Sequence, residues 1–478
     1  MTVIDSPAAT SVVLDLQRPR ARFPRIHEGR YEVDPVGSGI APVAPRLVET
    51  ARRAGIRFLR IGLGIWLPGP TFEPGKAVAE REWFHGSTLQ DVADDSLYDW
   101  THLDRNLDIC VALGVEEVLF NVDYMPATLS ARRKPPKLPR AIRHIAQGYS
   151  FPDGVRSSPP RDPEVFAAAS LRAVRHVESR GLRIRAVELW NEPDLPLFYT
   201  GSFEEFWRMY APFARVMREA GHRVGGPSWA HVLQPELWRD EFIARCAREQ
   251  VPLDVYTWHR YPRSPQTVID CARAIRELLD RNGLQATESV IDEWGYNLHE
   301  GEPGFWGSAA MAAFMATALV GLVDAGVAAQ AGGLLCDPAP LPLDGERMLG
   351  LARRNGEPNP VFHCFAAYED FQQTPMRIPV DGDPAGVLAG TDEESTRLGV
   401  IISNAEDTPR RVALSLRGAE CDAELRLLTQ QSFDRDGGFE PAVALRIGGD
   451  PVEVELPPRT MAVVGGALLG PDARQVVV

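Results

Sequence analysis

The chain has 478 residues, of which 44% are hydrophobic and 24% are charged, which is enough for one large globular domain and a smaller one. Its formal net charge of −14 argues against a nucleic-acid partner, because phosphate binding needs a basic surface. The six cysteines include no Cys-x-x-Cys pair, so they suggest neither a zinc site nor a disulfide framework, and free thiols fit a cytoplasmic location.

The sequence also predicts no membrane partner. The N-terminus lacks the basic start and unbroken apolar core of a secretory signal. The longest apolar stretch, Ala309–Val323, is shorter than the roughly 20 residues that span a bilayer, and we expect it to form a core helix.

Short runs rich in Val, Ile and Leu alternate with segments of helical period, which is typical of β/α units around a parallel sheet. Glycines at Gly55 and Gly114 end two predicted helices, and Ser202 with Glu205 forms a capping box that begins another. Eight strands are predicted, at Tyr31–Gly37, Arg57–Leu63, Glu117–Asn121, Arg185–Trp190, Arg223–Gly226, Leu253–Trp258, Ser289–Glu293 and Gly332–Leu335. Eight such units predict a (β/α)8 TIM barrel, whose active site lies at the carboxyl ends of the strands.

The pattern changes after about Asp370, where strand-like alternation and turn residues replace helical periods. This predicts a C-terminal antiparallel domain resembling a β-sandwich. The expected division is a barrel over residues 21–372 and an accessory β domain over residues 373–478. The alternating stretch Ser11–Leu16 indicates that residues 1–20 join that β domain.

Two glutamates end buried strands beside tryptophans. Glu192 lies just past the fourth strand and Glu293 at the end of the seventh, so both should face the barrel mouth. This is the layout of a retaining glycosidase, whose two carboxyl groups stand roughly 5 to 5.5 Å apart, against roughly 6.5 to 9.5 Å in an inverting enzyme. The adjacent acids Glu188 and Asp292 are interpreted as bystanders, and Asp292 is expected to point away from Glu293 because successive strand side chains alternate.

Other side chains at the strand ends leave two interpretations open. An arginine on the second strand, Arg60, could orient Glu293 or neutralise another buried acid. Five tryptophans at or beyond strand ends could stack on sugar rings or simply fill the core, namely Trp66, Trp190, Trp229, Trp258 and Trp294.

From about Val36 to Asp370 the sequence resembles the glycoside hydrolases of family 39, a group of retaining β-xylosidases and α-L-iduronidases. The strongest motif is Leu189-Trp190-Asn191-Glu192-Pro193-Asp194. It is followed in the same order by Val224-Gly225-Gly226-Pro227, by Leu253-Asp254-Val255-Tyr256-Thr257-Trp258-His259-Arg260-Tyr261-Pro262, and by Asp292-Glu293-Trp294.

The resemblance implies that Glu192 is the acid/base and Glu293 the nucleophile of a double displacement through a covalent glycosyl-enzyme. It further implies that Asn191 holds the sugar 2-hydroxyl, and that His259 and Tyr261 line the pocket, with Tyr261 hydrogen-bonded to Glu293. The expected activity is exo-acting hydrolysis of a β-xyloside-like glycoside. We also expect Arg60, Trp66, Trp258 and Trp294 to contact substrate.

The sequence departs from the family in two places. The second strand of the family usually ends Arg-x-His-Gly, whereas here Arg60 is followed by Ile61 and Gly62, and the eighth strand lacks the expected aromatic residue. These departures leave the sugar open. A loop from Tyr124 to Pro152 carries Arg132, Arg133, Lys134, Lys137, Arg140 and Arg143 and no acid, which favours either an ordinary solvated loop or a site for uronic-acid glycans.

No spacing indicates a metal site or a nucleotide cofactor, so none is expected. The alternatives to a hydrolase are a non-catalytic carbohydrate-binding barrel and a transglycosidase. The sequence does not decide whether the chain forms a homo-oligomer.

Overall fold

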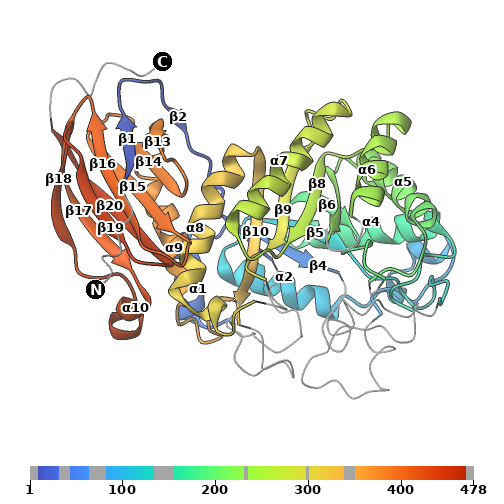
Figure 1. Ribbon diagram of the computed structural model, residues 1–478. Helices are drawn as coiled ribbons and strands as arrows, with labels where there is room; N and C mark the ends of the chain where they lie inside the picture. The colour runs from blue at the N-terminus through green and yellow to red at the C-terminus, as the bar shows by residue number, and fades with distance from the viewer. Residues whose placement is uncertain are drawn as a thin grey trace.

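The structure is a computed structural model that describes residues 9–31, 43–63, 82–133, 155–196, 198–230, 235–297, 301–337 and 350–469. A closed parallel barrel fills the green, cyan and yellow half of the molecule in Figure 1. Its strands pair in chain order, and β10 pairs with both β9 and β3 to close the ring. They are β3 (Gly29–Tyr31), β4 (Phe58–Gly62), β5 (Glu117–Val122), β6 (Arg183–Leu189), β7 (Val224–Trp229), β8 (Val255–Arg260), β9 (Glu288–Trp294) and β10 (Val327–Cys336), with β11 (Gly350–Ala352) added beside β10.

The predicted TIM barrel is thereby confirmed. The predicted first strand shares only Tyr31 with β3, and its remaining residues lie outside the described part of the chain. The other seven predicted strands overlap β4 to β10, with ends that shift by up to five residues.

Helices cover the outside of the barrel (Figure 1). Gly114 ends its helix in the left-handed conformation, and Ser202 and Glu205 form the expected capping box. The helices are α1 (Pro45–Arg53), α2 (Thr101–Leu113), α4 (Pro163–Ser179), α5 (Phe203–Glu219), α6 (Pro235–Glu249), α7 (Pro265–Arg281), α8 (Ala309–Asp324) and α9 (Pro360–Phe371), with short 3-10 turns η2 (Asp91–Ala93), η3 (Asp95–Leu97) and η5 (Phe305–Gly307). One further helix, α10 (Gln430–Asp436), belongs to the C-terminal part of the chain, between β17 and β18.

Two further β-sheets form the second domain, drawn mostly in orange and red in Figure 1, with β1 and β2 in blue. One has the order β13-β1-β16-β19 and the other β18-β17-β20-β15-β14-β12-β2. Their bounds are β1 (Thr10–Asp15), β2 (Ala21–Arg22), β12 (Met376–Arg377), β13 (Val380–Gly382), β14 (Val387–Thr391), β15 (Arg397–Asn404), β16 (Arg410–Arg417), β17 (Glu420–Leu428), β18 (Val443–Ile447), β19 (Val452–Leu456) and β20 (Thr460–Leu469). One apolar core lies between the sheets, so they form a sandwich.

The N-terminal strand β1 lies inside the smaller sheet, antiparallel to β13 and parallel to β16. That parallel pair departs from the expected fully antiparallel pattern. Strands distant in the chain can pair in either direction, because no short hairpin turn imposes the antiparallel one.

The sandwich packs against the barrel through α8 and α9, which lie between the two in Figure 1. Leu388, Ile401 and Met461 of the sandwich belong to the same apolar cluster as the barrel helices. Among the described helices, none has both the length and the apolarity needed to cross a bilayer.

Candidate active site

The barrel interior changes from apolar to polar along the strands. Its lower layer includes Phe58, Leu119, Ala186, Val255 and Val290. Because strand side chains two residues apart share a face, the next inward side chains are Arg60, Asn121, Glu188, Thr257 and Asp292, all buried. A buried polar layer therefore forms the floor of the carboxyl-end face, where barrel enzymes place their chemistry.

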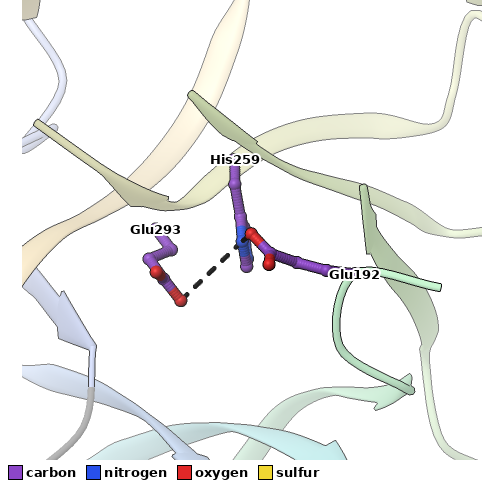
Figure 2. A group of neighbouring side chains, drawn as sticks. All are labelled: Glu192, His259 and Glu293. Carbon is purple, nitrogen blue, oxygen red and sulfur yellow. Dashed lines mark hydrogen bonds and ion pairs between the residues drawn. The ribbon is translucent and has the colours of Figure 1, made fainter. Parts of the chain in front are cut away.

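The two predicted catalytic glutamates meet above this floor. Glu192 and Glu293 lie on opposite sides of His259 in Figure 2, and one carboxylate oxygen of each stands within 4.8 Å of the other and of a His259 nitrogen. This separation is nearer to the roughly 5 to 5.5 Å of a retaining pair than to the roughly 6.5 to 9.5 Å of an inverting pair.

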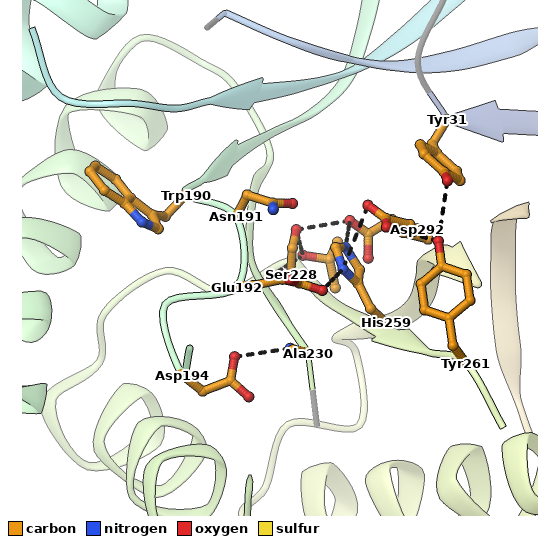
Figure 3. A network of polar contacts seen from close by, with 12 residues as sticks. Tyr31, Trp190, Asn191, Glu192, Asp194, Ser228, Ala230, His259, Tyr261 and Asp292 are labelled. Carbon is orange, nitrogen blue, oxygen red and sulfur yellow. Dashed lines mark hydrogen bonds and ion pairs between the residues drawn. The ribbon is translucent and has the colours of Figure 1, made fainter. Parts of the chain in front are cut away.

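Glu192 lies in the segment after β6, on a backbone held in an unusual conformation. Trp190 and Glu192 have φ values of 73° and 48°, in the left-handed region that costs side-chain-bearing residues about 1–3 kcal/mol. The backbone N–H of Glu192 donates to the Ser228 carbonyl at 3.1 Å, and the Trp190 indole donates to the Phe198 carbonyl at 3.1 Å. These bonds hold the strained turn, and Figure 3 shows that Trp190 points away from the carboxylates while Glu192 points toward them.

Glu293 is fixed from two sides. The Tyr261 hydroxyl donates to its Oε1 at 2.8 Å, and the hydroxyl oxygens of Tyr261 and Tyr31 lie 3.2 Å apart. Its Oε2 lies 3.6 Å from Arg60 Nη1 and 3.7 Å from His259 Nδ1. Burial raises the pKa of Glu293, an effect that His259, Arg60 and the Tyr261 hydrogen bond oppose.

Arg60 is a buried cation shared by the floor. Its Nε lies 2.9 Å from Asp292 and 3.0 Å from Glu188, and its Nη2 donates to Asn191 Oδ1 at 2.9 Å. Burial alone would lower the pKa of Arg60, but the surrounding carboxylates outweigh it and raise that pKa well above its ordinary value. With its amide oxygen engaged, Asn191 retains the amide N–H groups as donors for a sugar hydroxyl.

Arg60→Met should lower the free energy of unfolding by about 3–5 kcal/mol, because it leaves buried carboxylates without their common cation. The measurement is urea denaturation followed by tryptophan fluorescence, which reports on the barrel because all ten tryptophans lie between Trp66 and Trp306. The matched control is Arg52→Met on α1, whose pair with Glu49 is 70% and 52% exposed and should contribute about 0–1 kcal/mol. Equal effects of the two changes would contradict the prediction.

The site holds more acids than cations. Glu188, Glu192, Asp292 and Glu293 lie around Arg60 and His259, and this excess of negative charge favours proton uptake. Burial, reinforced by Asp292, raises the pKa of Glu188 to about 7.

Glu188 should make stability depend on pH. Its pKa rises from 4.5 in the unfolded chain to about 7 in the fold, so the folded state binds more protons between these values. The free energy of unfolding should therefore fall by about 3 kcal/mol as the pH rises from about 4.5 to about 7. Glu188→Gln should lack that fall in denaturation series across this range, whereas Glu116→Gln, at a side chain 59% exposed, should keep it.

Two expectations about bystander acids are wrong. Asp292 does not point away from Glu293, since both side chains approach Arg60 and His259. The cause is a bulge: Trp258 pairs with Ile291, but His259 pairs with Glu293, so Asp292 is an extra residue in β9. Glu188 also belongs to the site, because it lies two residues beyond the inward Ala186. That alternation could have identified Glu188, and the sequence gives no signal for the bulge.

The tryptophans are placed differently from the expected sugar platform. Trp258 and Trp294 have no exposed surface, and their indoles donate to Ser289 Oγ at 3.0 Å and to Gln330 Oε1 at 2.9 Å. Trp258 lies between the inward Thr257 and His259, so it points outward into the helix layer. The structure therefore makes both indoles core residues rather than sugar contacts.

Two other expectations fall wholly or partly outside the described residues. Trp66 lies there, as do Lys134, Lys137, Arg140 and Arg143 of the basic loop. In the described part of that loop, Arg133 Nη1 donates to Oε2 of Glu205 on α5 at 2.7 Å.

Glu192, His259 and Glu293 are the types of residue that can bind a divalent cation. Two observations argue against such a role: both ring nitrogens of His259 already face carboxylates, and Arg60 supplies the positive charge of the floor. We assign no metal to this site.

Comparison with known proteins finds a related family over part of the chain. The family model for glycosyl hydrolases family 39 matches residues 173–282, which contain Glu192, His259 and Tyr261. A β-xylosidase of Caldicellulosiruptor saccharolyticus is 27% identical over 193 residues, 37% of this chain and 36% of that protein. A β-xylosidase of Geobacillus stearothermophilus is 26% identical over 34% of this chain and 31% of that protein. The chain thus spans about a third of the length of the curated relatives it matches.

Solved structures match over almost the whole chain. A family 39 enzyme from Xanthomonas axonopodis pv. citri has a TM-score of 0.69 at 18% identity, covering 97% of this chain and 98% of that one. A monomeric β-xylosidase from Caulobacter crescentus CB15 has a TM-score of 0.68 at 18% identity, covering 97% and 100%. These likenesses show a common fold. The family match and the β-xylosidase relatives support the predicted resemblance to glycosyl hydrolase family 39.

Proposed function

We propose that the protein is a retaining glycoside hydrolase that removes a terminal β-xylose-like sugar by double displacement. The observation that carries the proposal is the close approach of Glu192 and Glu293, with carboxylate oxygens within 4.8 Å across His259. The curated relatives are named β-xylosidases, which supports the sugar class and the exo action. Six free cysteines support a reducing, cytoplasmic location.

In the first step, Glu293 attacks the anomeric carbon while the glycosidic bond breaks and Glu192 gives its proton to the leaving oxygen. The attacking atom is Oε2, because Oε1 holds the 2.8 Å hydrogen bond from Tyr261 and the nearest cations to Oε2 stand 3.6 and 3.7 Å away. In the second step, Glu192 takes a proton from water, the water oxygen bonds to the anomeric carbon, and the bond to Glu293 breaks.

The role of each carboxyl follows from its surroundings. Glu293, at a strand end between Tyr261 and Arg60, has the fixed position that nucleophilic attack requires. Glu192, whose side chain is 13% exposed, lies on a turn where it can reach a leaving group and then water. Asn191 is placed beside them to donate to the sugar 2-hydroxyl.

The test is incubation with a 2-fluoro xyloside bearing an activated leaving group, after a screen of aryl glycosides has identified the sugar. A working nucleophile forms a long-lived ester, so the protein mass should rise by one fluoroglycosyl group, located at Glu293 by peptide mapping. Hydrolysis without labelling would exclude double displacement. Binding of the sugar with neither label nor turnover would favour the non-catalytic carbohydrate-binding alternative, and transfer to an added acceptor would identify a transglycosidase.

A further inference from the structure

The bulge in β9 gives this site a carboxylate beneath its histidine. Asp292 is fully buried and lies beside His259 and Ser228 in Figure 3. His259 Nδ1 lies 2.8 Å from Glu192 Oε1, and His259 Nε2 lies 3.3 Å from Asp292 Oδ2. Asp292, His259 and Glu192 thus form a continuous chain from the floor of the barrel to the proposed acid/base.

Asp292 is held firmly in this place. Its Oδ2 accepts from Ser228 Oγ at 2.8 Å and lies 2.9 Å from Arg60 Nε. These contacts fix the oxygen that meets His259 Nε2, so the ring is held with Nδ1 toward Glu192. Orientation of an imidazole by a carboxylate on its far nitrogen is a general way to set which nitrogen carries the proton.

We propose that Asp292 is a positioning residue that acts through His259. By holding the ring, it keeps one shared proton on the Glu192–His259 pair, and both steps of the reaction use that proton. The inference rests on the proposed function. With the proton on Glu192, the pair is the acid of the first step. Once that proton has gone to the leaving oxygen, the Glu192 carboxylate is the base of the second step, and the proton that it takes from water restores the pair.

The electrostatics favour a protonated imidazole. Burial lowers the pKa of His259, but Glu293 and Asp292 outweigh it and hold that pKa well above 6.5. Burial raises the pKa of Asp292, but His259 and Arg60 outweigh it, so Asp292 remains an anion. The charged and titratable groups around the ring in the described structure are Glu192 after β6, Asp292 and Glu293 on β9, Glu188 on β6, Arg60 on β4, Tyr261 after β8 and Tyr31 on β3.

The proton balance is complete without another reactant. In the first step the leaving oxygen takes the proton of Glu192, which leaves Glu192 as a carboxylate beside the neutral imidazole. In the second step the water proton returns to the pair. Because His259 Nδ1 and Glu192 Oε1 stand 2.8 Å apart, the alkaline limb of kcat/KM should report loss of the proton held between them.

The test is Asp292→Asn, which keeps the size of the side chain and removes its charge. The alkaline limb of kcat/KM should move to lower pH by about 1 unit or more, the usual effect of losing an opposite charge at contact distance. A purely structural role would lower activity evenly across pH and leave the limb in place. Asp254→Asn, before β8 at the opposite end of the barrel, should also leave the limb in place.

A titration of the unaltered enzyme keeps the test valid if Asp292→Asn does not fold. The enzyme is prepared with ¹⁵N in the histidine rings and titrated with base. The NMR signal assigned to His259 should remain that of an imidazolium at pH values well above the ordinary histidine pKa of about 6.5. Titration at or below that value would overturn the inference, as would an unmoved limb in folded Asp292→Asn. If Glu293→Ala were still active, the proposed function itself would fail, whereas an inactive Glu293→Ala with an unmoved Asp292→Asn limb would remove only this inference.

Discussion

Glu293→Ala should abolish turnover of every glycoside, with a loss of kcat on the order of 10⁵-fold. The loss should be the same for good and poor leaving groups, because no other described side chain stands where Oε2 could attack the anomeric carbon. The measurement is steady-state hydrolysis of 2,4-dinitrophenyl and alkyl glycosides of the sugar found in the screen.

Added azide gives this prediction a chemical signature. Removal of the Glu293 carboxylate opens space on the side of the sugar opposite the leaving group, and azide entering there should give a glycosyl azide of inverted configuration. Glu288→Ala is the matched control, since Glu288 begins the same strand at the opposite end of the barrel, where it pairs with Arg223 at 2.9 Å. Activity in Glu293→Ala close to that of Glu288→Ala would contradict the assigned nucleophile.

The barrel and the meeting of its two glutamates could be predicted because both depend on local patterns. Seven of the eight predicted strands overlap the observed ones by more than one residue, since buried parallel strands are short apolar runs between helical periods. Closing the ring brings the carboxyl ends of all strands to one face. The motif around Glu192 and the end of β9 at Glu293 therefore converge without any information about their packing.

The floor of the site could be predicted only in part, because it depends on which face of a strand each residue occupies. The spacing of His259 and Tyr261 gave the correct shared face, and the same rule applied to Trp258 would have placed it outside the barrel. The rule places Asp292 inward, two residues after Val290, but it fails at Glu293, because the bulge in β9 changes the alternation and is set by pairing with β8. Pairing across strands is a property of the tertiary fold that one strand's sequence does not contain.

The clustering of charge shows the same limit. Arg60 had two interpretations from sequence, orienting Glu293 or neutralising another acid, and the structure shows contacts of both kinds. Glu188, Asp292 and Glu293 come from β6 and β9, and only the closed barrel brings them to one guanidinium. The raised pKa of Glu188 follows from this burial and could not be inferred from its neighbours in the chain.

Glu192→Ala should separate the two steps of the reaction. Hydrolysis of glycosides with poor leaving groups should fall by about 10²- to 10⁴-fold, because they need the proton that Glu192 supplies. Formation of the glycosyl-enzyme from a 2,4-dinitrophenyl glycoside should remain fast, since that leaving group departs as an anion. The ester to Glu293 should then accumulate, visible as a burst of dinitrophenol before slow turnover.

Azide should restore turnover of the activated substrate in Glu192→Ala, because it attacks the glycosyl-enzyme without needing a base. The product should be a glycosyl azide of retained configuration, opposite to that from Glu293→Ala, so one chromatographic comparison assigns both carboxyls. The alkaline limb of the pH profile should also disappear, since the shared proton of Glu192 and His259 is no longer used. Glu219→Ala, at an exposed residue near the end of α5, should keep the unaltered profile and gain nothing from azide. Equal losses for good and poor leaving groups in Glu192→Ala would show that Glu192 is not the acid, because removal of a proton donor must discriminate by leaving group.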